Sequence, residues 1–283
     1  MSKVAIVTDS SAYIPENLLE QYNISVAPLV VIWGEDEYLD GVDIKPDGFY
    51  ERLDNTDVMP STSQATPRSF KEAYTPLYEQ DYEILSIHIS EKLSGTIPSA
   101  VQAKGILPDD ATIEIIDSNT IAMALGYQVL LAARAVTDGA SLAECKEIVL
   151  KTRSMCGVVF AVDTLEFLHR GGRIGGASKF LGTALNIKPI LEVADGRIES
   201  IERVRTRKKS ITRLVELVEE RIQGRQPVRL AALHANAEDD ARECLDIAAN
   251  QLGATEIIFT SISPAIGVHT GPGTVGLAYL AGM

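Results

Sequence analysis

Cysteine is scarce in this sequence, and long apolar runs are absent. The 283 residues include three cysteines, Cys145, Cys156 and Cys244, which are odd in number and far apart. This excludes the disulfide framework of a small secreted protein and suits reduced thiols in a cytoplasm. The apolar run at residues 4–7 is too short for a signal peptide, and no run approaches the ~20 residues that span a bilayer. We therefore expect a cytoplasmic chain without stable membrane insertion.

Basic charge is also in short supply. Lys and Arg total 26 against 39 Asp and Glu, which gives a formal net charge of −13. A general nucleic-acid binder needs a basic footprint for the phosphates, so this balance excludes that class. The acidic surface also repels small anions at long range. An anionic ligand would have to be recognised by a local cluster of donors, or mainly through an uncharged part of itself.

Motifs for metals and nucleotides are missing as well. His88, His169 and His234 show no His-x-x-x-His spacing, and no Cys-x-x-Cys pair occurs, so we expect no metal site. Residues 169–176 have the glycine density of a phosphate loop but lack the Gly-x-x-x-x-Gly-Lys-Ser/Thr pattern. The alternative for this segment is a flexible connection before a helix expected near residues 178–186. We expect no cofactor.

What the sequence does contain is an alternation of short apolar runs with amphipathic stretches. Strands are expected at residues 4–7, 25–32, 84–89 and 113–116, each followed by a polar turn and helical spacing. This β-α-β order is typical of a mostly parallel sheet flanked by helices. Length favours two domains, and we place them at residues 1–154 and 155–283.

The second half departs from this simple alternation. A strand is expected at residues 158–162, and strands at 190–193 and 197–204 flank Asp195-Gly196, the pattern of a tight antiparallel hairpin. Strands at 228–233 and 256–262 follow, separated by a helix at 238–252. The second domain is thus expected to contain a mixed sheet with helices, and the whole chain belongs to the α/β class.

Four polar loops follow predicted strands, where open α/β sheets usually bind ligands, and we expect them to meet. They are residues 8–11, 59–64, 93–96 and 267–273. Ser94 precedes a helix expected near Thr96, so its hydroxyl could hold a carboxylate or only cap that helix. His269 could face a ligand or be a hydrogen-bonded structural histidine. Thr62 and Ser63 are equally explicable as turn residues.

Five segments in register resemble the bacterial DegV proteins, a family that includes the fatty-acid-binding subunits of fatty acid kinase. The resemblance covers essentially the whole chain. The segments are Val7-Thr8-Asp9-Ser10, Thr62-Ser63-Gln64, Leu93-Ser94-Gly95-Thr96, Gly171-Gly172-Arg173-Ile174 and His269-Thr270-Gly271-Pro272-Gly273.

The resemblance implies two α/β domains, with a lipid tunnel associated with the second domain and its carboxylate end between the two. One long-chain fatty acid is the implied ligand. The residues matching Thr62, Ser94 and His269 form the implied hydrogen-bond network around its carboxylate. We add their neighbours Ser63 and Thr270 to the expected site.

The resemblance also implies a protein partner. Basic residues are concentrated at Arg170, Arg173 and residues 203–209, where they form either a solvated helix start or a positive patch. The residues matching Arg173, and the stretch that contains Arg205 and Arg207, are implicated in docking the kinase that phosphorylates the bound acid. On this view the chain is a non-catalytic carrier, which presents a fatty acid for acyl-phosphate formation and phospholipid synthesis.

The energetics of an acyl tail are compatible with so acidic a chain. A sixteen-carbon acid buries about fourteen methylenes at roughly 0.8 kcal/mol each, or about 11 kcal/mol before binding costs. The tail therefore supplies the affinity, and a few neutral donors suffice to orient the head. The core-like segments 160–168, 180–190 and 259–266 are candidate walls.

An enzyme is the alternative function. Ser94 would be the nucleophile and His269 the base of an acyl transferase or hydrolase, with Asp9 or Asp117 orienting the histidine. Against this, Ser94 lies in Leu-Ser-Gly-Thr and not in a Gly-x-Ser-x-Gly elbow. A phosphotransferase with its own nucleotide site is a third possibility, which no loop pattern supports.

Overall fold

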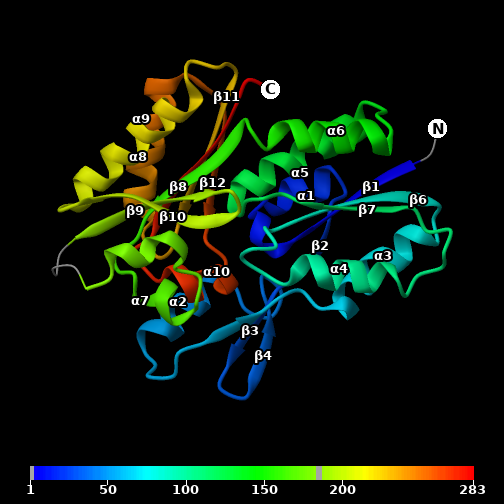
Figure 1. Cartoon of the computed structure of the whole chain (residues 1–283), viewed down its shortest axis with the longest axis horizontal. Helices are drawn as coiled ribbons and strands as arrows, with labels where there is room; N and C mark the ends of the chain where they lie inside the picture. The colour runs from blue at the N-terminus through cyan, green and yellow to red at the C-terminus, as the bar shows by residue number, and fades with distance from the viewer. Residues whose placement is uncertain (1–2, 183–186) are drawn as a thin grey trace.

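The computed structural model describes residues 3–182 and 187–283. A four-stranded and a six-stranded sheet lie side by side along the long axis of the molecule, each flanked by helices (Figure 1). We call them the first and the second sheet. Both confirm the α/β class, with a parallel first sheet and a mixed second sheet.

The first sheet is parallel throughout. Its strands, in spatial order, are β2 (Ser25–Ala27), β1 (Lys3–Asp9), β6 (Tyr82–His88) and β7 (Ile113–Asp117). Its helices are α1 (Glu16–Gln21), α3 (Pro67–Tyr78), α4 (Thr96–Lys104), α5 (Ala122–Thr137) and α6 (Leu142–Thr152). Helices α3 and α4 lie on one face and α5 and α6 on the other (Figure 1). The two central strands, β1 and β6, are mostly buried, as expected when helices cover both faces.

The prediction of a single strand at residues 25–32 was wrong, because Pro28 divides this segment. Proline cannot donate to a sheet ladder, and β2 ends one residue before it. The chain then turns into β3 (Val30–Trp33), which pairs with β4 (Asp36–Leu39) and β5 (Ser61–Ser63) in a small antiparallel sheet. Helix α2 (Pro46–Asp54) connects β4 to β5. The segment 59–64, expected to be a loop, therefore contains a strand.

The second sheet combines parallel and antiparallel pairs. Its strands, in spatial order, are β10 (Arg197–Val204), β9 (Lys188–Ala194), β8 (Cys156–Ala161), β13 (Val275–Ala281), β11 (Val228–His234) and β12 (Ala254–Ser261). The expected hairpin is confirmed, with Asp195 and Gly196 at φ of 48° and 74° in the turn. Strand β13, which the sequence analysis did not anticipate, runs through the middle of this sheet.

The two faces of the second sheet have different neighbours. Helices α8 (Arg207–Ile222) and α9 (Glu238–Leu252) cover the outer face. The inner face, which includes Val158, Leu233 and Ala278, belongs to the core cluster that also contains the first sheet's residues. Short elements complete the chain: η1 (Ser10–Ala12), α7 (Glu166–Arg170), η2 (Gly175–Phe180) and α10 (Pro264–Thr270). The helix expected near residues 178–186 overlaps only with the 3₁₀ turn η2, and residues 183–186 lie outside the described residues.

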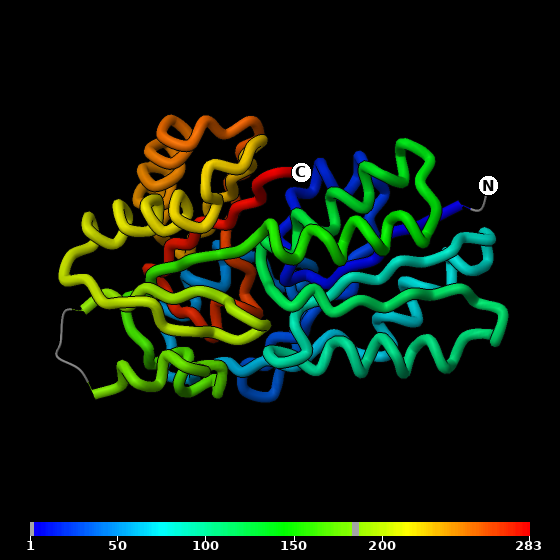
Figure 2. Tube along the Cα trace, turned by 45° about the horizontal axis from the view of Figure 1, so that its top comes forward, coloured from blue at the N-terminus to red at the C-terminus, as the bar shows by residue number. Residues whose placement is uncertain are grey.

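Helix α5 joins the two parts of the molecule. It contacts β1 and β6 of the first sheet and β8 and β13 of the second. The first sheet and its helices occupy one end of the elongated trace and the second sheet and its helices the other (Figure 2). The division at residues 154 and 155 stays a prediction; it falls between α6 and β8. No helix in the described ranges is long and apolar enough to cross a membrane.

Candidate ligand cavity

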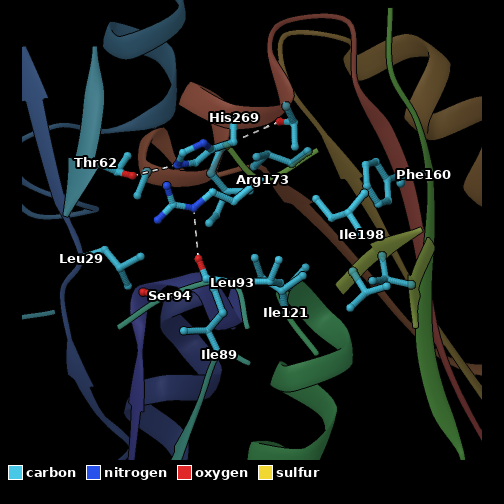
Figure 3. A pocket seen from close by; sticks show the side chains of 18 of the residues that line it. Leu29, Thr62, Ile89, Leu93, Ser94, Ile121, Phe160, Arg173, Ile198 and His269 are labelled. Atoms are coloured by element: carbon cyan, nitrogen blue, oxygen red, sulfur yellow. Dashed lines mark hydrogen bonds between the residues drawn. The ribbon is translucent and has the colours of Figure 1, made fainter. Parts of the chain in front are cut away.

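A cavity lies between the two sheets. It contains about 820 Å³ of space not filled by protein atoms, including its open mouth. Ile89, Leu93 and Ile121 follow strands of the first sheet and form one wall. The inner face of the second sheet forms another, with Phe160 and Ile198 opposite these residues (Figure 3). The lining is mostly apolar.

Two of the three segments expected to form walls do so. Phe160 and Leu168 come from the first segment, and Ile262, Ala265 and Ile266 come from the third. No residue in the described part of the segment 180–190 lines the cavity. The walls therefore come from both sheets, and not only from the C-terminal half.

One end of the cavity is polar. Thr62 lies on β5, opposite Val31 of β3, and His269 lies on the short helix α10. The Thr62 hydroxyl and His269 Nε2 are 2.8 Å apart, although the two residues are 207 positions apart in the chain. Figure 3 shows the pair at the same end of the cavity as Ser94. His269 is therefore presented by a helix and not by the glycine-marked loop that the sequence suggested.

Asp40 anchors the helix that presents His269. The backbone N–H of Ala265, in the first turn of α10, donates to Asp40 Oδ1 at 3.0 Å, and the Ser10 hydroxyl donates to Oδ2 at 2.6 Å. Burial raises the pKa of Asp40 to about 6, although these two hydrogen bonds oppose the shift. The sequence analysis missed Asp40, because a single acidic residue after an exposed strand carries no local signal.

Gly171 supports the imidazole from the other side. A Cβ placed on Gly171 would lie 2.0 Å from His269 Nδ1, so only glycine fits there. Nδ1 is buried and has no hydrogen-bond partner among the described residues. The pKa of His269 is lowered to about 4, mainly by burial and secondly by the nearby positive charge of Arg173. The ring is therefore neutral at pH 7, and one of its nitrogens lacks a partner.

Arg173 joins the two halves at this end of the cavity. Its Nη1 donates to the Gly171 carbonyl at 2.8 Å, and its Nε donates to the Leu93 carbonyl at 3.2 Å (Figure 3). The other two expected docking residues do not line the cavity. Arg205 is exposed, whereas Arg207 forms ion pairs with Asp163 and Asp240.

All five residues expected to hold a carboxylate line this one cavity: Thr62, Ser63, Ser94, His269 and Thr270. Helix α4 begins at Thr96 as expected, but its N-cap is Gly95. The Ser94 hydroxyl instead lies 2.9 Å from that of Thr96. The Thr270 hydroxyl donates to the Ile266 carbonyl at 3.3 Å, so its proton is used within α10.

The loop at residues 8–11 does not join the other three, contrary to expectation. No residue in it lines the cavity. Asp9 instead accepts a hydrogen bond from the backbone N–H of Ile89 at 3.0 Å and lies 3.1 Å from His88 Nδ1. On its other side, His88 Nε2 is 2.6 Å from the Ser86 hydroxyl. This cluster fastens the ends of β1 and β6 together within the core.

The side chains proposed for the alternative enzyme have other partners. His269 Nε2 contacts Thr62, Ser94 contacts Thr96, and Asp9 contacts His88. Asp117 accepts from the backbone N–H of Asn119 at 2.7 Å. The described residues also contain no group of three or more His, Cys, Asp or Glu side chains that could hold a metal ion.

Fold and cavity together define an α/β protein with a mostly apolar cavity that ends in hydroxyl groups, a neutral imidazole and one guanidinium. The chain belongs to the DegV family, since the model of that family, described as one of uncharacterised proteins, matches residues 3–282. A DegV domain-containing protein of Streptomyces coelicolor is 37% identical over 276 residues, which are 97% of each chain.

Two solved structures are similar to this chain in both fold and sequence. A DegV family protein from Thermus thermophilus, described by its fatty acid binding, has a TM-score of 0.92 and 34% identity, over 99% of this chain and 100% of that one. DegV of Bacillus subtilis, described as a fatty acid binding protein, has a TM-score of 0.89 and 32% identity, over 99% and 100%. The family resemblance predicted from the five sequence segments is thereby confirmed.

Proposed function

We propose that this protein binds one long-chain fatty acid in the cavity, with its carboxylate held by Thr62, Ser63, Ser94, His269 and Thr270. One observation carries the proposal. The cavity is apolar along its length and ends at a polar cluster to which both halves of the chain contribute. The fatty acid binding of the relatives from Thermus thermophilus and Bacillus subtilis supports the same ligand class.

The polar end suits a carboxylate. The Thr62 hydroxyl and the neutral His269 ring hold two protons and use one in the bond between them, so the pair can donate one hydrogen bond to the acid. Hydrogen bonds to a charged acceptor are worth about 1.5–3 kcal/mol each. The Arg173 guanidinium lies at the same end and offsets the negative charge of the acid. The acidic surface of the protein therefore does not prevent binding, because the tail supplies most of the affinity.

Delivery to a kinase is the second part of the proposal. The protein acts as a non-catalytic cytoplasmic carrier, and it presents the bound acid to the catalytic subunit of a fatty acid kinase. Arg173, Arg205 and Arg207 form the proposed docking surface. Arg173 is exposed and also lines the cavity, which supports contact between a docked kinase and the cavity mouth.

Native mass spectrometry tests the ligand. The purified protein is stripped of lipid, mixed with palmitate or oleate, and sprayed from a volatile buffer. We expect an added mass of one acid per chain. A polypeptide that stays empty with both acids would overturn the proposal.

A coupled assay tests delivery. Fatty acid, ATP and the kinase catalytic subunit are combined with the wild type or with Arg205→Ala, and acyl phosphate is measured. We expect a several-fold slower rate for Arg205→Ala with unchanged lipid content. Lys208→Ala, which removes another exposed charge of the same segment, is the control and should leave the rate unchanged. Equal rates for both variants would remove Arg205 from the docking surface.

A further inference from the structure

Gly276, the second residue of β13, is the only glycine among the described residues that lines the cavity. Its backbone lies outside the left-handed region. A Cβ placed there would lie 3.4 Å from both Leu233 Cδ1 and Phe160 Cβ, which is ordinary van der Waals contact. By contrast, a Cβ on Gly157 of the neighbouring strand β8 would lie 2.6 Å from the Tyr279 hydroxyl. Neither backbone conformation nor a clash therefore explains glycine at position 276.

The sheet register shows what the missing side chain leaves open. Gly276 pairs with Phe160 of β8 on one side and with Leu233 of β11 on the other, and both pairs are antiparallel. Directly opposed residues point to the same face of a sheet, so all three face the cavity. Two large side chains thus flank a position without one. The result is a slot in the wall, in which one added carbon would touch both neighbours.

The slot lies on the other side of the cavity from Thr62 and Ser94. Phe160 and Ile198 lie on the opposite side of the cavity from Thr62 and Ser94 (Figure 3). Gly276 is the direct neighbour of Phe160 in the sheet. A ligand whose carboxylate lies beside Thr62 would therefore bring the end of its tail, and not its head, to the slot.

We propose that Gly276 determines the acyl-chain length that the cavity accepts, because the terminal carbons of the tail occupy the slot between Phe160 and Leu233. This inference rests on the proposed function, since it assumes an acyl ligand with its head at Thr62. Glycine weakens the interior of a strand relative to alanine. Its presence at a position that would tolerate a Cβ fits a site kept open for the ligand.

A chain-length competition tests the proposal. Lipid-free protein is mixed with equal amounts of saturated acids of twelve, fourteen, sixteen and eighteen carbons, and the bound fraction of each is measured by native mass spectrometry. We compare the wild type with Gly276→Ala and Gly276→Val. Each methylene that no longer fits should cost about fourfold in affinity, from about 0.8 kcal/mol per methylene. The preferred length should therefore become shorter from Gly276 to Ala and again from Ala to Val.

The controls separate this inference from the proposed function. Gly48→Ala, in α2 with nothing within 4 Å of the added Cβ, should keep the wild-type length profile. Lipid-free Gly276→Ala should melt no lower than the wild type, which shows that its fold is intact. An unchanged length profile in both position-276 variants, or an equal loss for all four acids, would refute the role of Gly276 while fatty acid binding stands. A wild type that binds none of the acids would refute the proposed function itself.

Discussion

Two buried histidines in this protein have opposite surroundings. His88 lies wholly inside the first sheet, between Asp9 and Ser86, and the Tyr74 hydroxyl extends the cluster at 2.7 Å from that of Ser86. Both of its ring nitrogens have partners. His269 is almost as deeply buried, but only Nε2 has a partner. The first cluster has a partner for both ring nitrogens, whereas the second leaves Nδ1, which packs against Gly171, without one.

This difference distinguishes a structural polar cluster from a binding site. Burying a polar group without a partner costs free energy, so completed clusters stabilise the fold, and incomplete ones need another explanation. No residue of the His88 cluster lines the cavity between the two sheets, whereas His269 does. The following changes test this contrast, from the largest expected effect to the smallest.

Removal of His88 should have the largest effect on stability. His88→Ala leaves the buried Asp9 carboxylate without one of its partners and also removes the edge contact with Phe70, at 4.8 Å between ring centroids. We expect a loss of about 3–5 kcal/mol in the free energy of unfolding, measured by urea denaturation. The protein that remains folded should still bind palmitate. A His88→Ala variant that is as stable as the wild type but binds no palmitate would contradict the roles assigned to the two histidines.

Asp40 should make stability depend on pH. Its raised folded-state pKa means that the folded protein binds more protons than the unfolded chain between about pH 4 and 6. Its contribution is therefore present at low pH and is lost as the pH rises through about 6. Asparagine stays neutral at every pH, as protonated Asp40 does. Because the pKa shift is about two units, the free energy of unfolding of Asp40→Asn relative to the wild type should rise by about 2–3 kcal/mol from pH 4 to pH 7. Urea denaturation at pH 4 and pH 7 measures this difference, and a constant difference would contradict it.

Removal of His269 should affect the ligand more than the fold. His269→Ala deletes one donor to a charged acceptor, so palmitate should bind more than tenfold more weakly, a loss of about 1.5–3 kcal/mol. The free energy of unfolding of the lipid-free protein should change less than it does in His88→Ala. Thr62→Val, which removes the partner of Nε2, should behave similarly. Unchanged affinity in both variants would refute their assignment to the carboxylate.

The smallest effect is expected for Ser94. Ser94→Ala removes one hydroxyl among several at the polar end, so we expect a loss of about 1 kcal/mol, or about fivefold in affinity. Ser154→Ala, which removes an exposed hydroxyl that does not line the cavity, is the control. A covalent serine probe should leave Ser94 unlabelled in the wild type. Stoichiometric labelling, together with ester hydrolysis, would favour the enzyme instead.

Much of the fold was predictable because it depends on local pattern. The alternation of strands and helices and the hairpin at Asp195-Gly196 follow from periodicity and turn chemistry over a few residues. The break at Pro28 was missed although the proline is visible in the sequence, because an apolar run on both sides resembles one strand. Strand β13 was missed because its small, uniformly apolar residues show no alternation.

By itself, the sequence determined the α/β class, the parallel first sheet, the family and the five residues that line the polar end of the cavity. Only the tertiary structure decided that Thr62 contacts His269, that Asp40 anchors α10, and that Gly171 leaves room for the imidazole. The physical reason is the separation along the chain over which each interaction acts. Helix and strand preferences act between residues that are close in the chain, whereas a cavity and its hydrogen bonds depend on which distant segments pack together.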